Sequence, residues 1–154
     1  MIDFTKPQQY TLSIRLSTDG FSFSIYNPIH DNSLSTIEKE TDTSLSLTAN
    51  LKATFRESDF LNHSYKRVNI MMADKRFTIV PLELFEEEQA ELLFYHNHQK
   101  RENETVICNI LKKNNVAIIF GMDKSAHTFL SEQYPEAHFY SQSTPLIDYF
   151  SVKS

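Results

Sequence analysis

The chain has 154 residues, of which 40% are hydrophobic and 23% are charged. This composition is typical of a packed globular protein and argues against a disordered or membrane chain. The formal net charge of −5 argues against a nucleic-acid partner, because such partners are held mainly by lysine and arginine side chains that neutralise phosphates. Residues 1–9 carry no basic cluster followed by an apolar run, and no apolar stretch approaches the roughly 18 residues of a membrane span. We therefore expect a cytoplasmic protein.

The single cysteine, Cys108, excludes an intrachain disulfide and a cysteine-rich zinc site. It lies in an apolar run, so a small core residue is a better interpretation than a nucleophile. The basic pairs Lys75-Arg76 and Lys112-Lys113 fall where turns are predicted, and we expect solvated loops rather than phosphate clamps at both.

Two half-buried strands are predicted near the N-terminal end. Apolar and polar residues alternate from Tyr10 to Ser17 and again from Phe21 to Ile25. Between them, Asp19-Gly20 supplies residues that tolerate the positive φ angles of a type I′ turn. A two-residue loop at Asp19-Gly20 predicts that Leu16 pairs with Phe23 and Ile14 with Ile25.

A third strand is predicted over residues 34–40, followed by a helix capped near Asp42 or Thr43. The core stripe of that helix is expected at Leu47, Leu51 and Phe55.

A second hairpin is predicted from the alternation of residues 68–72 and 77–79 across the turn 73–76. This register pairs Met72 with Phe77 and Ile70 with Ile79. Pro81 then opens a predicted helix that runs to about His96, because proline is favoured at the first helical position. Its core residues are expected to be Phe85, Leu92 and Leu93, and Glu86 to Glu88 are expected to be solvated.

A polar connector at residues 98–103 separates a predicted first domain, residues 1–99, from a second, residues 100–154. Beyond the connector, residues 105–111 and 116–120 predict a third hairpin around Lys113-Asn114-Asn115. A helix with core residues Ala126, Phe129 and Leu130 is expected to end at Tyr134-Pro135, followed by a short strand over residues 138–140.

A last helix is predicted from Thr144-Pro145, with Leu146, Ile147 and Phe150 on an apolar face that nothing later in the chain covers. Burial of such a face favours self-association or a protein partner. The chain as a whole predicts an α/β fold, in which a mixed sheet built from hairpins is flanked by helices.

Three segments carry a resemblance to a known family: the opening hairpin Tyr10–Tyr26, the run Phe77–Phe85, and Phe129-Leu130 with Tyr134-Pro135. With these, the chain resembles an uncharacterised bacterial domain-of-unknown-function family of the actin-like ATPase superfamily. The resemblance implies a ribonuclease H-like lobe followed by the beginning of a second, incomplete lobe. Because the chain is shorter than a complete two-lobed member, we expect a fragment or a shortened relative.

Actin-like ATPases hold nucleotide phosphates on glycine-containing turns, with an aspartate near the start of the first turn that organises magnesium. The corresponding residues here are Asp19 and Gly20, which are adjacent instead of separated. Gly121 is the only other glycine, so no second phosphate turn can be built. ATP hydrolysis is therefore disfavoured, and a hairpin turn explains Asp19-Gly20 on its own.

Metal sites are also disfavoured. His96 and His98 with His63 or Glu91 are suitable zinc ligands, but favourable charge positions at a helix C-terminus explain the two neighbouring histidines more simply. We expect no metal and no cofactor.

Three functions remain open. The first is a non-catalytic actin-like module that works through protein contacts. The second is a degenerate nucleotide-binding sensor, or an actin-like ATPase whose site is completed elsewhere. The third is a structural subunit without a ligand, and nucleotide binding would separate the second from the other two.

Overall fold

The computed structural model describes residues 9–27 and 32–144. The chain forms two compact units. Unit 1 comprises Met1–Met71 and Ser125–Phe139, and unit 2 comprises Met72–Lys124 and Tyr140–Ser154. The expected boundary between a first lobe (residues 1–99) and the start of a second lobe (residues 100–154) stays a prediction.

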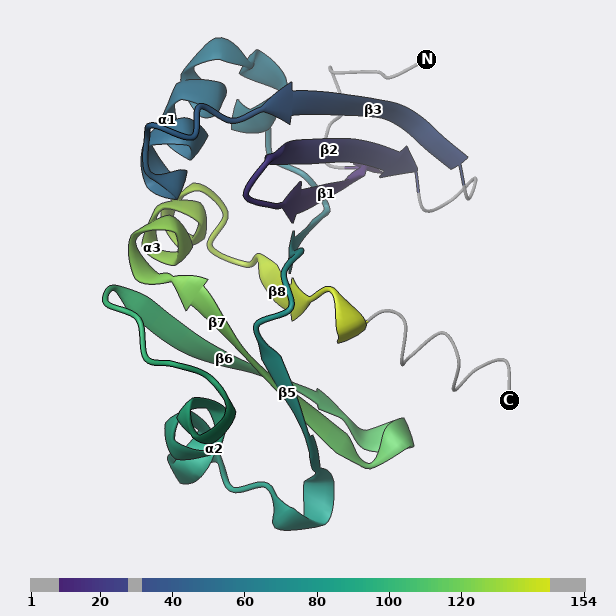
Figure 1. The fold of residues 1–154 in the computed structure, drawn as a ribbon. Helices are drawn as coiled ribbons and strands as arrows, with labels where there is room; N and C mark the ends of the chain where they lie inside the picture. The colour runs from purple at the N-terminus through teal and green to yellow at the C-terminus, as the bar shows by residue number, and fades with distance from the viewer. Residues whose placement is uncertain (1–8, 28–31, 145–154) are drawn as a thin grey trace. The chain divides into compact units, whose positions relative to one another are not determined.

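A five-stranded sheet organises unit 1 (Figure 1). Its strands follow the order β3-β2-β1-β4-β8, in which β1, β2 and β3 are antiparallel neighbours. The pairing of β1 with β4 and of β4 with β8 requires crossovers, so the expected α/β class with a mixed sheet is confirmed. The strands are β1 (Thr11–Leu16), β2 (Gly20–Asn27), β3 (Asn32–Glu40), β4 (Arg67–Met72) and β8 (His138–Ser141).

The first hairpin forms, but its predicted register is wrong. Leu16 pairs with Phe21 and Ile14 with Phe23, so the loop lies at Thr18-Asp19. Gly20 has no positive φ, and the turn is not type I′. The observed register differs by two residues, which keeps the same side chains on the same face of the sheet, and the predicted apolar face is buried as expected.

Helix α1 (Leu47–Glu57) is capped by Ser46, whose hydroxyl accepts a hydrogen bond from the Ala49 N–H at 3.1 Å. The predicted caps, Asp42 and Thr43, are therefore wrong. The Asp42 carboxylate instead accepts hydrogen bonds from the backbone N–H and the hydroxyl of Ser44, at 3.0 and 2.6 Å. These bonds make a separate local turn before the helix begins.

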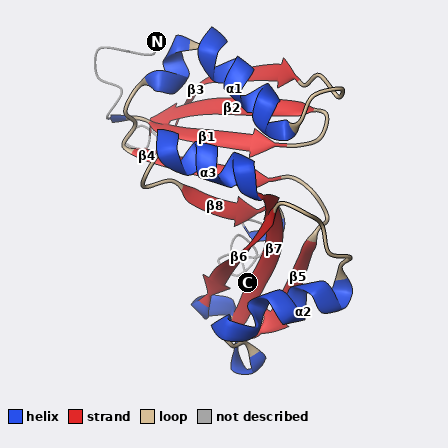
Figure 2. Cartoon of the chain, turned by 90° about the vertical axis from the view of Figure 1, so that its left-hand side faces the viewer, coloured by secondary structure: helices blue, strands red, loops and turns tan. Residues whose placement is uncertain are grey.

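Helices α1 and α3 (Lys124–Gln133) lie on the same face of the five-stranded sheet (Figure 2). Phe55 of α1 packs edge-on against Phe129 of α3, with ring centroids 5.1 Å apart, and also contacts Tyr134. Leu51 and Phe55 are buried as predicted, whereas Leu47 is only half-buried. Ala126 and Leu130 complete the predicted core face of α3.

Unit 2 contains a three-stranded sheet of order β5-β7-β6, with strands β5 (Phe77–Pro81), β6 (Glu104–Leu111) and β7 (Val116–Asp123). The predicted third hairpin is confirmed in β6 and β7. Its turn ends at Asn115, which takes the left-handed conformation with φ of 55°, a conformation that asparagine tolerates well.

The predicted second hairpin is wrong, because β4 and β5 belong to different sheets. Phe77 pairs with Phe120 and Ile79 with Ile118 instead of with residues of β4. Arg76, which was expected in an exposed turn between the two strands, is buried in an ion pair.

The predicted helix from Pro81 to about His96 is only partly formed. Pro81 ends β5, two short 3-10 turns follow (η3, Leu82–Leu84, and η4, Glu87–Gln89), and α2 (Ala90–Asn97) begins later. The extended backbone of Phe85 and Glu86 interrupts the helical period. Leu92 is consequently 71% exposed, contrary to expectation.

The core of unit 2 forms between α2 and one face of its sheet. Phe94 is fully buried with Val80, Ala90 and Ile119. The predicted core residues Phe85 and Leu93 pack against this cluster, and Glu86 to Glu88 are exposed as expected.

The predicted last helix, with Leu146, Ile147 and Phe150, lies outside the described residues. Within residues 9–27 and 32–144, no helix is both long and apolar enough to cross a membrane.

Candidate functional site

The first turn, Ser17 to Gly20, is the place where an actin-like nucleotide site was expected. The Ser17 hydroxyl donates to the Gly20 carbonyl oxygen at 2.9 Å and accepts from the Gly20 N–H at 3.2 Å. Thr41, just after β3, donates from its N–H to the Asp19 carbonyl and from its hydroxyl to the Thr18 carbonyl, at 3.2 and 2.8 Å. The turn is thus closed by the chain's own hydrogen bonds, while the Asp19 side chain is exposed.

A neighbouring strand leaves no room for a side chain at Gly20. A Cβ atom at this position would lie 2.6 Å from the carbonyl oxygen of Lys39 in β3, which is too close for any side chain. Close approach of another backbone is a common reason for glycine in a strand. The glycine is therefore explained by strand packing.

We expect Gly20→Ala to lower the free energy of unfolding by about 1–3 kcal/mol, because β2 and β3 must move apart to admit the methyl group. Asp19→Ala is the matched control, since the Asp19 side chain is exposed and its backbone bonds are kept. Urea unfolding followed by circular dichroism measures both. Equal, small losses for the two variants would contradict this role of Gly20.

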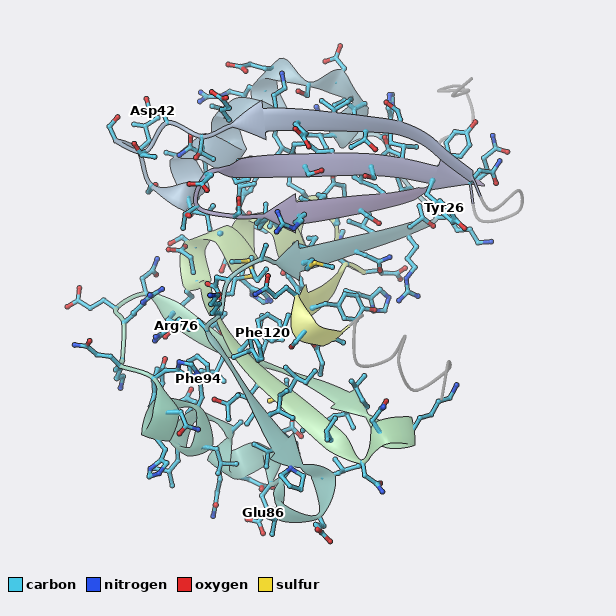
Figure 3. The ribbon with its side chains drawn as sticks, turned by 45° about the vertical axis from the view of Figure 1, so that its right-hand side comes forward. Tyr26, Asp42, Arg76, Glu86, Phe94 and Phe120 are labelled. Atoms are coloured by element: carbon cyan, nitrogen blue, oxygen red, sulfur yellow. The ribbon has the colours of Figure 1, made fainter. Side chains whose placement is uncertain are left out.

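A buried ion pair lies in unit 2. Arg76 donates from Nε to Glu104 Oε2 at 2.6 Å and from Nη2 to Glu104 Oε1 at 2.8 Å. Its Nη2 also donates to the Gln99 carbonyl oxygen. The hydroxyl of Tyr95 donates to Glu104 Oε1 at 2.9 Å, and the guanidinium lies 5.2 Å above the centre of the Phe94 ring (Figure 3).

The electrostatics of this cluster follow from burial and hydrogen bonding. Burial would raise the pKa of Glu104, but hydrogen bonds from Arg76 and Tyr95 and the charge of Arg76 outweigh it and hold that pKa below its ordinary value. The hydrogen bond to Glu104 raises the pKa of Arg76. Burial, followed by the bond to Glu104, raises the pKa of Tyr95 to about 12. At neutral pH the pair is charged and Tyr95 is a neutral donor.

Gly121 of β7 makes room for the Glu104 carboxylate. A Cβ atom at Gly121 would lie 2.3 Å from Glu104 Oε2 and 3.1 Å from the Phe94 ring. Sequence reasoning missed this cluster, although a glycine inside an apolar strand is a signal of close approach. The arrangement joins the starts of β5 and β6 to the end of α2 and supports the fold of unit 2.

The other sequence candidates are explained by packing. Cys108 is half-buried against the unit 2 core, as predicted, and burial, followed by the charge of Glu87, raises the pKa of its thiol. The His98 ring stacks on Phe94 and its Nε2 lies 3.0 Å from the Phe77 carbonyl oxygen. His96 is exposed, and no three metal-binding side chains gather in the part of the chain that the structure describes.

Comparison with known proteins identifies the family. The family model described as "Protein of unknown function (DUF3822)" matches residues 1–154. The chain belongs to the DUF3822 family. No functionally curated protein matches it.

Solved structures place the DUF3822 chain in the actin-like class. A Bacteroides thetaiotaomicron protein, described as having an actin-like ATPase fold and unknown function, is 82% identical with a TM-score of 0.95. The match covers 100% of this chain and 60% of that protein, so the chain spans 60% of its length. The expected resemblance to an uncharacterised bacterial family with this fold is confirmed.

A second solved structure is more distant. The cytoplasmic domain of EpsL, an inner membrane component of the type II secretion system of Vibrio cholerae, has a TM-score of 0.52 at 11% identity. The match covers 86% of this chain and 56% of that one. At this identity the likeness concerns the fold alone.

Proposed function

We propose that the DUF3822 chain is a non-catalytic actin-like module that works through contacts with proteins. The observation that carries this proposal is the closed first turn. A phosphate-binding turn presents backbone N–H groups and a conformationally free glycine to the anion. Here the Gly20 N–H is hydrogen-bonded to the Ser17 hydroxyl, and the carbonyl oxygen of Lys39 leaves no room for any larger residue at position 20.

Binding a phosphate at the Gly20 N–H would require breaking its hydrogen bond to the Ser17 hydroxyl. The Asp19 and Thr18 carbonyls are already bonded to Thr41, which connects the turn to the end of β3. Any opening of the turn therefore also loosens the contact with that strand. This coupling favours a structural role for the turn.

The alternative function is a nucleotide sensor whose site is completed by residues outside this chain. Exposure of the Asp19 side chain favours it, because an exposed carboxylate remains able to hold magnesium. The chain spans 60% of the length of its 82% identical relative, which leaves other residues of such a protein to complete a site.

Self-association through Leu146, Ile147 and Phe150 stays a prediction within the proposed function. The distant likeness to EpsL shows that the fold also occurs in a component of a secretion system.

Calorimetric titration with magnesium ATP and magnesium ADP tests the proposal directly. We expect no saturable heat with either nucleotide at concentrations up to the millimolar range. Saturable binding that is lost in Asp19→Ala would overturn the proposal in favour of the sensor.

Light scattering on the same sample tests association. We expect a molar mass that rises with concentration and falls to the monomer value in Ile147→Asp. Leu92→Asp is the matched control, because Leu92 is an exposed apolar residue of α2. A monomer at every concentration, or a loss of association in Leu92→Asp alone, would contradict association through Leu146, Ile147 and Phe150.

A further inference from the structure

Unit 1 contains a pocket that none of the assigned features uses. It has a volume of about 600 Å³ and is lined by residues 61–68 and 133–138, which lead into and begin β4 and β8. Pockets that bind small molecules typically have volumes of about 300–1,000 Å³. The size therefore suits a ligand rather than a single ion.

The pocket lies away from the turn at Asp19-Gly20. The Lys66 N–H donates to the carbonyl oxygen of Tyr10 at 2.9 Å, and Tyr10 immediately precedes β1. The turn at Ser17–Gly20 follows the other end of the same strand. Six residues of extended chain separate the two ends by about 20 Å, so the pocket is distinct from the expected nucleotide turn.

One hydrogen bond joins the two walls of the pocket, and another orders one of them. The Tyr134 hydroxyl, from the wall after α3, donates to the Leu61 carbonyl oxygen of the other wall at 2.6 Å. Within that second wall, the Tyr65 hydroxyl donates to the Phe60 carbonyl oxygen at 2.7 Å. The site is therefore largely preformed, which lowers the cost of ordering it on binding.

The charges that line the pocket favour an anion. Lys66 and Arg67 are both exposed lining residues, although Arg67 Nε also donates to Asn69 Oδ1 at 2.8 Å, and Glu136 is the carboxylate among the lining residues. His63 and His138 add imidazole rings. This local excess of positive charge contrasts with the chain's formal charge of −5.

The remaining surface of the pocket is apolar or neutral. Leu61 and Val68 are buried at its base, and Pro135 and Ala137 contribute to the opposite wall. Burial raises the pKa of Tyr65 to about 12 and also raises the pKa of Tyr134. The two phenols therefore remain neutral at physiological pH and add no negative charge.

We propose that this pocket binds a small organic anion, in which a phosphate or carboxylate group is attached to an apolar or aromatic body. Lys66 and Arg67 contact the anionic group, and the apolar base and the tyrosine rings contact the body. The site is independent of the proposed protein contacts.

The test uses phenyl phosphate and phenylacetate as probes, with inorganic phosphate as a third titrant, and follows the backbone amide NMR signals of the full chain. We expect saturable shifts at the amides of residues 61–68 and 133–138 with at least one aromatic anion, with a dissociation constant in the millimolar range or tighter. Tighter binding of phenyl phosphate than of phenylacetate would identify phosphate as the preferred anionic group, and the reverse would identify carboxylate.

The double variant Lys66→Ala and Arg67→Ala should weaken binding about tenfold, which corresponds to about 1.4 kcal/mol, because it removes both lysine and arginine cations that line the pocket. The matched control is Lys112→Ala with Lys113→Ala, which removes two exposed lysines of unit 2 and should leave binding unchanged. Amide signals elsewhere report whether the variants fold.

Three results would overturn the proposal. The first is the absence of saturable shifts at these amides with both aromatic anions. The second is unchanged binding by the folded Lys66 and Arg67 double variant. The third is equal affinity for inorganic phosphate and phenyl phosphate, which would contradict a role for the apolar base.

Discussion

The Arg76→Met variant is expected to unfold with a free energy about 3–5 kcal/mol lower than that of the unchanged chain, because it leaves the Glu104 carboxylate buried without its cation. The side chains of Arg76 and Glu104 are only 9% and 5% exposed, so water cannot replace the lost partner. The Gln99 carbonyl also loses its donor. Urea unfolding at neutral pH measures the difference.

Lys75→Met is the matched control for this prediction. Lys75 precedes Arg76 and is exposed, so the same substitution there should have little effect. Replacing both partners, as Arg76→Met with Glu104→Leu, should recover much of the lost stability, since no buried charge remains unpaired. A double variant no more stable than Arg76→Met would contradict the buried-charge explanation.

The pH dependence of the same variant gives an independent check. The folded-state pKa of Glu104 is depressed, so the ion pair contributes its full stability above the unfolded-state pKa of about 4.3, and that contribution is lost as the pH falls through the lower folded value. We expect the stability difference between the unchanged chain and Arg76→Met to shrink below about pH 4. A difference that stays constant on acidification would show that the loss comes from packing.

Gly121→Ala is the second substitution with a large expected effect. Its methyl group would lie 2.3 Å from Glu104 Oε2, and the carboxylate cannot move away without leaving Arg76. Overpacking of this kind costs about 1–3 kcal/mol. We expect the loss at the upper end of that range, because an ion pair is disturbed as well.

A double-mutant cycle with Glu104→Ala tests this coupling. In that background the carboxylate is absent, so adding the Gly121→Ala methyl should cost much less than in the unchanged chain, with a coupling energy of about 1–3 kcal/mol. Chemical denaturation of the four proteins gives the cycle. Additive losses would mean that the Phe94 ring, 3.1 Å from the same Cβ position, causes the effect instead.

Elements whose signals are local were predicted well from the sequence. The hairpin of β6 and β7 follows from two apolar runs around an Asn-Asn turn, and its Asn115 takes the left-handed conformation that such a turn needs. The helix from Lys124 to Gln133 ends before Tyr134-Pro135, because proline cannot continue a helix. In both cases the residues that determine the structure are neighbours in the chain.

The candidate site was predicted only in part. The positions of Asp19 and Gly20 in the first turn were expected, but the register was wrong because the hydroxyl of Ser17 closes a turn at Thr18-Asp19. The need for glycine at position 20 also comes from a residue distant in the chain, because the carbonyl oxygen of Lys39 in β3 would clash with a side chain there. No local sequence pattern indicates that the Ser17 hydroxyl bonds to Gly20 or that β3 lies close to Gly20.

By itself, the sequence determined where the strands and helices α1 and α3 form and, for most of them, which face is apolar, because these properties depend on the alternation of neighbouring residues. It did not determine the break between Pro81 and α2. Only the tertiary structure decided which strands from distant segments pair and which charged side chains meet. Strands β4 and β5 look like a hairpin locally, yet β5 pairs with β7 while Arg76 binds Glu104, 28 residues further along the chain. Strand pairing and charge burial depend on contacts between distant segments, and local periodicity carries no information about which distant segments meet.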